Sequence, residues 1–166
     1  TVSAAFGCPF EGEVSVDRVI EVACRVAEGN PHEIAFADTI GVGVPSQVSE
    51  ILGRATAALP GMRLRAHFHN TRNTGLANAY AAVVAGVSAL DSSAGGIGGC
   101  PFAPAATGNI PTEDLVYLLE RSGYSTGIDL DKLIATGEWL QGVLGRSIPS
   151  MLLKAGTFPK PAARAA

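Results

Sequence analysis

Positions at the ends of predicted strands recur at a nearly constant interval along the chain. Cys8, Asp38 and His69 each follow a short apolar run, and they are separated by 30 and 31 residues. An interval of this size accommodates one strand and one crossover helix, and four such βα units fit within the 166 residues. A closed (β/α)8 TIM barrel needs eight units in roughly 250 residues, so we expect the second half of such a barrel. The alternative is an open doubly wound sheet, but no glycine fingerprint follows the first predicted strand.

The spacing of apolar residues assigns the segments of the chain to strands and helices. The predicted strands are residues 2–6, 33–37, 63–68 and 87–91. The predicted helices are residues 16–28, 45–58, 73–85, 111–121 or 112–121, and 130–144. We therefore expect residues 1–145 to form the half-barrel domain and residues 146–166 to form a C-terminal extension. Its last part, residues 156–166, is rich in proline and alanine and is predicted to be a loose tail.

The composition excludes several classes of protein. The net charge is −3 and the isoelectric point is near 5.5, so the sequence offers no basic surface for nucleic acid or acidic lipid. The longest apolar stretch, residues 79–90, is too short to cross a bilayer. Three cysteines without close spacing argue against a disulfide framework, and no signal-like segment precedes the first strand. We therefore expect a cytoplasmic protein.

The sharpest local feature is the segment Ala66-His67-Phe68-His69-Asn70. Because side chains alternate along a strand, His67 and His69 are predicted to point to the same face. The carboxyl end of a barrel strand is where metals and substrates bind, and two imidazoles on one face can provide two metal ligands. The alternative is a pair of histidines that are buried or hydrogen-bonded to the backbone and hold no ligand.

A glycine-rich segment, residues 95–99, follows the fourth predicted strand. Four glycines around one isoleucine are not expected to hold a packed element, so we expect a mobile loop close to a ligand. Cys100 at its end can act as a proton donor or nucleophile, or can be a small residue in an ordinary turn.

Four further polar residues lie at the ends of predicted elements. Asp38 ends the second strand, where a carboxylate at a barrel mouth is more often functional than structural. Asn109 can cap a helix, turn the chain or ligate a metal through its amide oxygen. Glu113 and Asp114 fall in the first turn of a helix, where carboxylates complement the helix dipole.

Five segments together resemble the 3-hydroxy-3-methylglutaryl-CoA lyase family, and the match extends from Val2 to about Gly145. They are Gly7-Cys8-Pro9-Phe10-Glu11-Gly12, Asp38-Thr39-Ile40-Gly41-Val42-Gly43, His67-Phe68-His69, Gly98-Gly99-Cys100-Pro101, and Gly108-Asn109 with Thr112-Glu113-Asp114-Leu115-Val116. The Gly-Gly-Cys-Pro segment separates these lyases from the related isopropylmalate and homocitrate synthases and from the hydroxy-oxovalerate aldolases. Those enzymes share the barrel and the His-x-His pair.

The resemblance implies a metal-dependent carbon–carbon lyase. Its substrate would be 3-hydroxy-3-methylglutaryl-CoA or a similar 3-hydroxyacyl-CoA, cleaved to acetyl-CoA and acetoacetate as in leucine degradation and ketone-body formation. The implied ligands of a divalent metal, Mg²⁺ or Mn²⁺, are His67, His69 and Asn109. The implied catalytic residues are Cys100 in proton transfer, His67, Asp38 and Glu113.

The sequence departs from the family pattern in four ways. Asn70 stands where the lyases usually have aspartate, Phe102 stands in place of tyrosine, and Ala94-Gly95-Gly96 differs slightly from the usual loop. In addition, the family's first strand, which supplies an arginine, an aspartate ligand and a nearby glutamate, has no counterpart in these residues. Two imidazoles and one amide form an uncharged shell for a hard cation, which prefers carboxylate oxygen. We therefore predict weak or no metal binding by the chain alone, and no activity without the missing residues.

Two other interpretations remain open. One is a carbon–carbon bond-forming synthase or an aldolase on the same barrel. The other is an inactive half-barrel that binds a partner through its open sheet edges. The expected partners are an acyl-CoA substrate and a second copy of the chain in a homo-oligomer, as a dimer.

Overall fold

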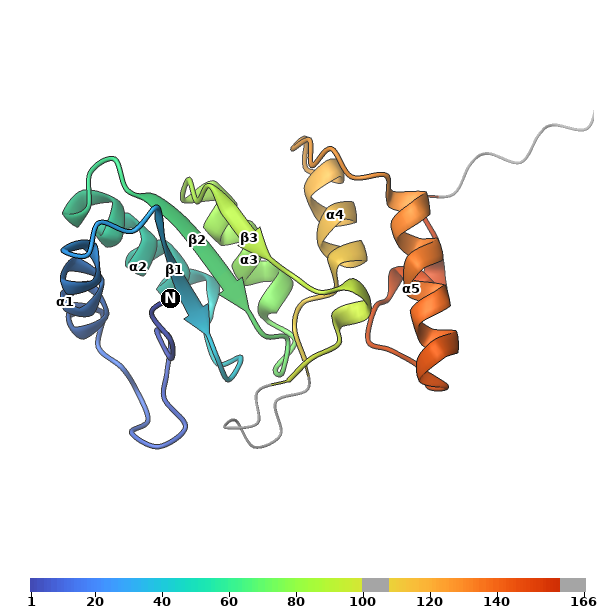
Figure 1. The fold of residues 1–166 in the computed structure, drawn as a ribbon, viewed down its shortest axis with the longest axis horizontal. Helices are drawn as coiled ribbons and strands as arrows, with labels where there is room; N and C mark the ends of the chain where they lie inside the picture. The colour runs from blue at the N-terminus through green and yellow to red at the C-terminus, as the bar shows by residue number, and fades with distance from the viewer. Residues whose placement is uncertain (100–107, 159–166) are drawn as a thin grey trace, which may run out of the picture.

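Three parallel strands form one sheet in the computed structural model, which describes residues 1–99 and 108–158. The strands are β1 (Glu33–Asp38), β2 (Arg63–Phe68) and β3 (Ala89–Asp91), and each lies beside its neighbour in the chain. Figure 1 shows α1 (Val16–Ala27), α2 (Pro45–Ala58) and α3 (Gly75–Val84) on one side of this sheet. The order of helices and parallel strands is the predicted succession of βα units.

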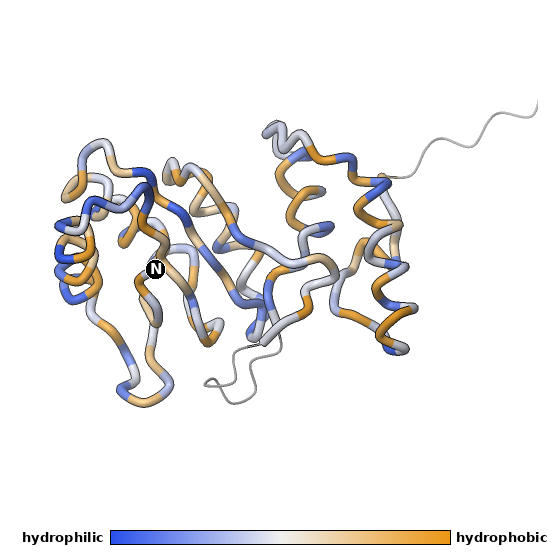
Figure 2. Tube along the Cα trace, in the orientation of Figure 1, coloured by the Kyte–Doolittle hydropathy of each residue, from blue (hydrophilic) through white to orange (hydrophobic). Residues whose placement is uncertain are grey.

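The two faces of the sheet differ in polarity because residues alternate along β2. Leu64, Ala66 and Phe68 are buried on the helix-covered face, whereas Arg63, Arg65 and His67 alternate with them. Figure 2 shows the hydropathy of the backbone segments that make up this layer. The core beneath the helices includes fully buried large side chains from β1, β2 and α2, namely Ile34, Phe36, Phe68, Val48, Ile51 and Leu52. Burial of each such side chain contributes about 1.5–3 kcal/mol. The polar side chains are left on the opposite face.

A second group of helices follows β3. Figure 1 shows α4 (Thr112–Arg121) and α5 (Leu130–Leu144) side by side, and the short α6 (Leu152–Ala155) contacts both. Asp129 caps α5 by accepting a hydrogen bond from the Lys132 N–H at 3.1 Å. The helix ends at Gly145, whose φ of 63° is the left-handed conformation that glycine adopts at little cost.

Most predicted elements are confirmed, with small differences at their ends. Four of them, 45–58, 63–68, 112–121 and 130–144, have the predicted bounds. The strand predicted at 33–37 includes Asp38, and the other strand and helices are shorter than predicted by one to two residues at an end.

The predicted first strand, residues 2–6, is wrong in extent. Val2 forms one parallel bridge, to Phe36, and the next residues turn, with Ala4 at a φ of 54°. The Ala4 N–H donates to the Thr39 hydroxyl at 2.9 Å, and the Ala5 N–H donates to the Ala37 carbonyl at 3.1 Å. Val2, Ala5 and Phe6 are all buried, a spacing that suits a turn and not the alternation of a strand.

The prediction that residues 95–99 hold no packed element is wrong for the first two. Gly95 and Gly96 are buried and belong to a 3₁₀ turn, η1 (Ala94–Gly96), with φ of 68° and 71°. A Cβ at Gly95 would overlap the side chain of Ile148, and one at Gly96 would lie 2.8 Å from Pro111 Cγ. Glycine is needed here because the backbone is left-handed and packed closely against its neighbours.

In the part of the chain that the structure describes, Cys8 and Cys24 form no disulfide. Within the same residues, every helix is too short or too polar to cross a membrane.

Candidate metal and substrate site

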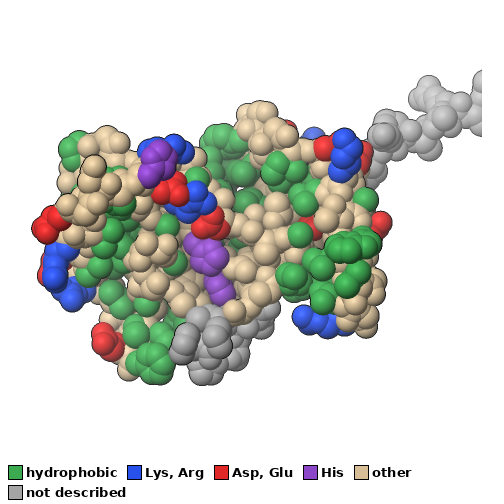
Figure 3. All heavy atoms as spheres, in the orientation of Figure 1, with side chains coloured by type: hydrophobic (Ala, Val, Ile, Leu, Met, Phe, Trp, Pro, Cys, Tyr) green, Lys and Arg blue, Asp and Glu red, His purple; other side chains and the backbone are tan. Residues whose placement is uncertain are grey.

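His67 and His69 lie together at the carboxyl end of β2. Their ring centroids are 5.2 Å apart, and the two rings meet edge to face at 65°. Both line a cavity of about 330 Å³, together with Asp91, Ala37 of β1, Thr39 just after β1, and Thr1 and Ser3 of the N-terminal segment. Figure 3 shows histidine side chains gathered on this face beside acidic and basic ones. The predicted shared face of the two histidines is therefore confirmed.

Asn109 is brought to the histidines by the backbone. His69 and Asn109 form an antiparallel bridge, in which the Asn70 N–H donates to the Gly108 carbonyl at 2.9 Å. The side-chain NH₂ of Asn109 donates to the carbonyl of Ile97 at 3.0 Å, which fixes the orientation of the amide. Residues 40 positions apart in the chain thus meet at one end of the sheet.

Two atoms at this meeting point fit metal ligation. His69 Nδ1 and Asn109 Oδ1 are buried, and neither has a hydrogen-bond partner among the described residues. Unpaired buried polar atoms are rare in native structures and call for an explanation such as a bound ion. Burial, and then the neighbouring His67, lower the pKa of His69, which favours the neutral imidazole that metals bind.

The donor set is nevertheless incomplete. Within residues 1–99 and 108–158, the structure holds no cluster of three or more histidine, cysteine, aspartate or glutamate side chains suited to a metal. Imidazole and amide donors are neutral, whereas Mg²⁺ and Mn²⁺ favour carboxylate oxygen. His67, His69 and Asn109 therefore fit one side of a metal shell and leave room for further ligands.

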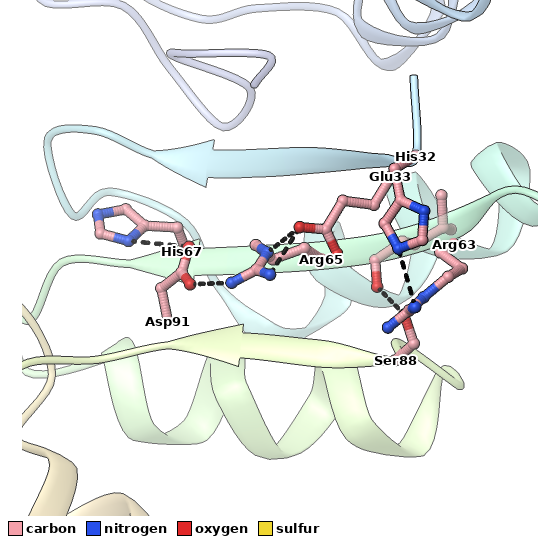
Figure 4. Close-up of polar contacts among 8 residues, drawn as sticks. His32, Glu33, Arg63, Arg65, His67, Ser88 and Asp91 are labelled. Carbon is pink, nitrogen blue, oxygen red and sulfur yellow. Dashed lines mark hydrogen bonds and ion pairs between the residues drawn. The ribbon is translucent and has the colours of Figure 1, made fainter. Parts of the chain in front are cut away.

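Asp91 belongs to the same cavity, although no sequence motif marks it. Its Oδ2 lies 3.8 Å from His67 Nδ1, and its Oδ1 accepts a hydrogen bond from Arg65 Nη1 at 2.5 Å. Arg65 also contacts Glu33 Oε1, at 2.6 Å from Nη2 (Figure 4). Both carboxylates, Asp91 first, raise the pKa of Arg65. Glu33, Arg65 and Asp91 all lie in predicted strands, but the sequence does not show the pairing register that brings them together.

Asp38 lies outside the histidine cavity. The residue is 1% exposed, and its carboxylate accepts hydrogen bonds from the N–H groups of Val42 and Gly43, each at 3.0 Å. Burial raises the pKa of this carboxyl group, and the amide hydrogen bonds partly offset that rise. In the described structure, Asp38 therefore holds the turn that follows β1.

Glu113 and Asp114 each join α4 to another segment. Both lie in the first turn of α4, as predicted. Glu113 is fully buried, and its two carboxylate oxygens accept the Gly95 N–H at 2.9 Å. Asp114 accepts hydrogen bonds from the Ser150 hydroxyl at 3.0 Å and from the N–H groups of Met151 and Leu152 at 2.9 Å. The helix dipole explains their position in the sequence, and these contacts explain their burial.

The remaining site predictions are placed as follows. Asn70 accepts a hydrogen bond from the Gly75 N–H at 3.1 Å, at the start of α3. Cys100 and Phe102 lie outside the described residues. The structure thus brings His67, His69 and Asn109 together, and it places Asp38 and Glu113 in supporting positions away from them.

Comparisons with known proteins agree with this arrangement. The HMGL-like family model matches residues 1–140. The (R)-citramalyl-CoA lyase of Chloroflexus aurantiacus is 49% identical over 93% of this chain and 49% of its own length. A hydroxymethylglutaryl-CoA lyase of Bacillus subtilis is 40% identical over 92% of this chain and 51% of its own length. The chain therefore spans about half the length of these curated relatives.

A solved structure gives the same relationship in three dimensions. The HMG-CoA lyase of Acinetobacter baumannii, in complex with coenzyme A and 3-methylmalate, is 44% identical with a TM-score of 0.88. The match covers 95% of this chain and 53% of that one. The parallel βα units are thus half of a (β/α)8 barrel, as predicted. With a family model matching most of its length, the chain belongs to the hydroxymethylglutaryl-CoA lyase (HMGL-like) family.

Proposed function

We propose that the chain carries half of the active site of a divalent-metal-dependent lyase that cleaves a 3-hydroxyacyl-CoA to acetyl-CoA and a keto acid. The observation that carries this proposal is the pair His67 and His69 in one cavity at the carboxyl end of β2, with Asn109, whose amide oxygen is unpartnered among the described residues, bridged to His69 through the backbone. Relatives named as acyl-CoA lyases, and one solved with coenzyme A, support the substrate class.

The metal, Mg²⁺ or Mn²⁺, would be held by His67, His69 and Asn109. When bound, it would supply Lewis-acid polarisation of the substrate hydroxyl and lower the pKa of that group. A base would accept the hydroxyl proton, and His67, which is part-exposed in the cavity, would help to orient the hydroxyl group. The carbon–carbon bond then breaks, and its electron pair forms the enolate of acetyl-CoA. Cys100 would donate the proton that converts the enolate to acetyl-CoA.

Asp38 and Glu113 would support this reaction indirectly, because each holds a segment of the backbone in place. Asp38 fixes the turn at residues 42–43, beside β1. Glu113 holds the N–H of Gly95, at the start of the glycine segment that leads to Cys100. We assign residues 1–145 to the half-barrel and residues 146–166 to an extension, of which residues 150–152 bind Asp114.

The preferred substrate is 3-hydroxy-3-methylglutaryl-CoA, and the second candidate is (R)-citramalyl-CoA. The second is favoured by the 49% identity to the Chloroflexus aurantiacus enzyme. Both carry a tertiary alcohol next to the bond that breaks, so the same residues serve either reaction. The keto acid distinguishes them, since the first gives acetoacetate and the second gives pyruvate. Condensation of acetyl-CoA with a 2-oxo acid would instead identify a synthase.

The open edges of the sheet favour association with a second copy in a homodimer or with another half-barrel. The three cysteines lie far apart in the sequence, a pattern that is typical of a reducing, cytoplasmic setting.

The test joins residues 1–166 behind the first half of the Bacillus subtilis relative, which supplies the other half of the barrel. With Mg²⁺, we expect this protein to release acetyl-CoA from one of the two thioesters, and the chain alone to release none. His67→Ala should lower turnover by about 10²–10⁴-fold. The matched control is His32→Ala, because His32 is exposed and contacts Arg63, at the start of β2. A folded joined protein that cleaves neither thioester, or that tolerates His67→Ala, would contradict the proposal.

A further inference from the structure

A row of charged side chains crosses the open face of the sheet. Glu33 comes from β1, Arg65 from β2 and Asp91 from β3, and Arg65 lies between the two carboxylates (Figure 4). Its Nε donates to Glu33 Oε1 at 2.8 Å, and its Nη1 donates to Asp91 Oδ1 at 2.5 Å. The three side chains are only 25–37% exposed, so these charge-assisted contacts are partly shielded from water. Arg65 therefore fixes Asp91 from one side.

The other oxygen of Asp91 faces His67. Because His67 and Asp91 are partners in the register of β2 and β3, their side chains leave the sheet on the same side. Asp91 Oδ2 lies 3.8 Å from His67 Nδ1, and in Figure 4 the second ring nitrogen is directed away from the carboxylate. At this distance, the carboxylate acts through its charge, which favours a ring N–H dipole directed at it.

The proton position on a histidine ring decides which nitrogen can bind a metal or accept a proton. A carboxylate beside one nitrogen holds the proton there and leaves the lone pair on the other. His69 has no such neighbour, since its Nδ1 is without a partner among the described residues. A carboxylate therefore lies beside the ring of His67 and can fix its proton position, whereas His69 has no such neighbour among the described residues.

We propose that Asp91 is a positioning residue that keeps the proton of neutral His67 on Nδ1, so that Nε2 is the nitrogen presented to the metal or substrate. Arg65, anchored by Glu33, keeps the Asp91 carboxylate in place. The relevance of this arrangement to catalysis rests on the proposed lyase function, but the proton position itself does not.

The test is ¹⁵N NMR of the histidine rings in the full chain at pH 8.5, without metal. We expect His67 to carry its proton on Nδ1. Asp91→Ala should shift the proton to Nε2, the position preferred by a neutral histidine in water. Asp91→Asn keeps an oxygen acceptor and should retain Nδ1–H in part, and Arg65→Met should weaken the preference.

The matched control is Asp17→Ala, because Asp17 also pairs with an arginine, Arg54, but is exposed and lies on α1. It should leave the His67 signals unchanged. A proton on Nε2 in the unmodified chain, or Nδ1–H retained in a folded Asp91→Ala variant, would overturn the proposal. The first of these results does not depend on whether any variant folds.

A second measurement separates this proposal from the proposed function. In the joined protein, Asp91→Ala should weaken Mn²⁺ binding by about 10–100-fold, as expected for loss of a group that orients a metal ligand. If the joined protein cleaves neither thioester while His67 keeps Nδ1–H through Asp91, the lyase function fails and the positioning role stands. If it cleaves and His67 is protonated on Nε2, the positioning role fails alone.

Discussion

His69 and Asn109 are joined by an antiparallel backbone bridge, and each ends in a buried atom without a hydrogen-bond partner among the described residues. The two atoms, His69 Nδ1 and Asn109 Oδ1, differ in chemistry but share a location at one end of the sheet. Leaving a polar atom buried and unpaired costs about 1–3 kcal/mol. Two unpaired buried atoms at one place are explained by a ligand that binds there.

The first prediction concerns the affinity of this site in the chain alone. His67, His69 and Asn109 supply no negative charge, and a hard cation gains most from carboxylate ligands. We expect titration calorimetry of the chain with Mn²⁺ to show binding weaker than micromolar. Micromolar affinity for the bare chain would mean that its own residues complete the metal shell.

The second prediction compares two glycines of α5. A Cβ at Gly137 would lie 2.8 Å from Glu113 Oε1 and 2.8 Å from Leu153 Cδ2, whereas a Cβ at Gly142 meets nothing within 4 Å. Gly142→Ala should therefore stabilise the fold by about 0.4–1 kcal/mol, through helix propensity and the unfolded state. Gly137→Ala should destabilise it, because the Glu113 carboxylate must move from the Gly95 N–H.

Urea unfolding of both alanine variants measures this difference. Equal stabilisation by the two substitutions would show that Glu113 is not held against α5 as the structure describes.

The third prediction concerns the attachment of residues 150–152 to α4. Asp114→Ala removes the acceptor of three hydrogen bonds from that segment and should cost about 1.5–3 kcal/mol. The control is Asp131→Ala, since Asp131 lies in the first turn of α5 and is exposed. Its effect should stay within about 0.5 kcal/mol.

Limited proteolysis should also cut residues 150–155 faster in the Asp114→Ala variant than in the control. If both variants resist cleavage equally, Asp114 does not hold the segment.

The fourth prediction concerns pH. Burial raises the pKa of Asp38 above its ordinary value of 3.8, so the folded state binds this proton more tightly than the unfolded state does. Stability from this group is therefore greatest below pH 3.8 and falls as pH rises through the raised folded pKa. Asp38→Asn has no such proton. We expect the stability advantage of the unmodified chain over Asp38→Asn to shrink between pH 3 and pH 8.

Unfolding curves of the two proteins across this range test the sign, since other carboxylates are common to both. An advantage that grows with pH would mean that the amide hydrogen bonds of Val42 and Gly43 outweigh the burial of Asp38.

The spacing of apolar and polar residues predicted most of the strands and helices, because each such pattern is contained within a short segment of the chain. The spacing of apolar residues at 63–68 predicted β2, and the alternation of side chains predicted the shared face of His67 and His69. The segment at residues 2–6 was predicted wrongly because a short apolar run does not reveal whether it alternates or turns. There, the Ala4 N–H pairs with Thr39 and not with a strand.

The candidate site was predictable only in part, for a related reason. His67 and His69 are marked by their spacing, and Asn109 was identified through the family resemblance. Asp91 required the pairing register of β2 and β3, which the sequence does not display. The carboxylate contacts of Glu113 with Gly95 likewise depend on how α4 packs against η1, and the glycine pattern alone suggested a loop.

The most direct test of the metal site is Mn²⁺-induced broadening of the histidine and asparagine side-chain NMR signals in the full chain. Because paramagnetic broadening acts only near the ion, it reports location even when binding is weak. We expect the signals of His67, His69 and Asn109 to broaden first and together, and those of His32, the third histidine, to remain sharp. Broadening of His32 before or equally with the other two histidines, or an unaffected Asn109, would contradict the assignment of this site.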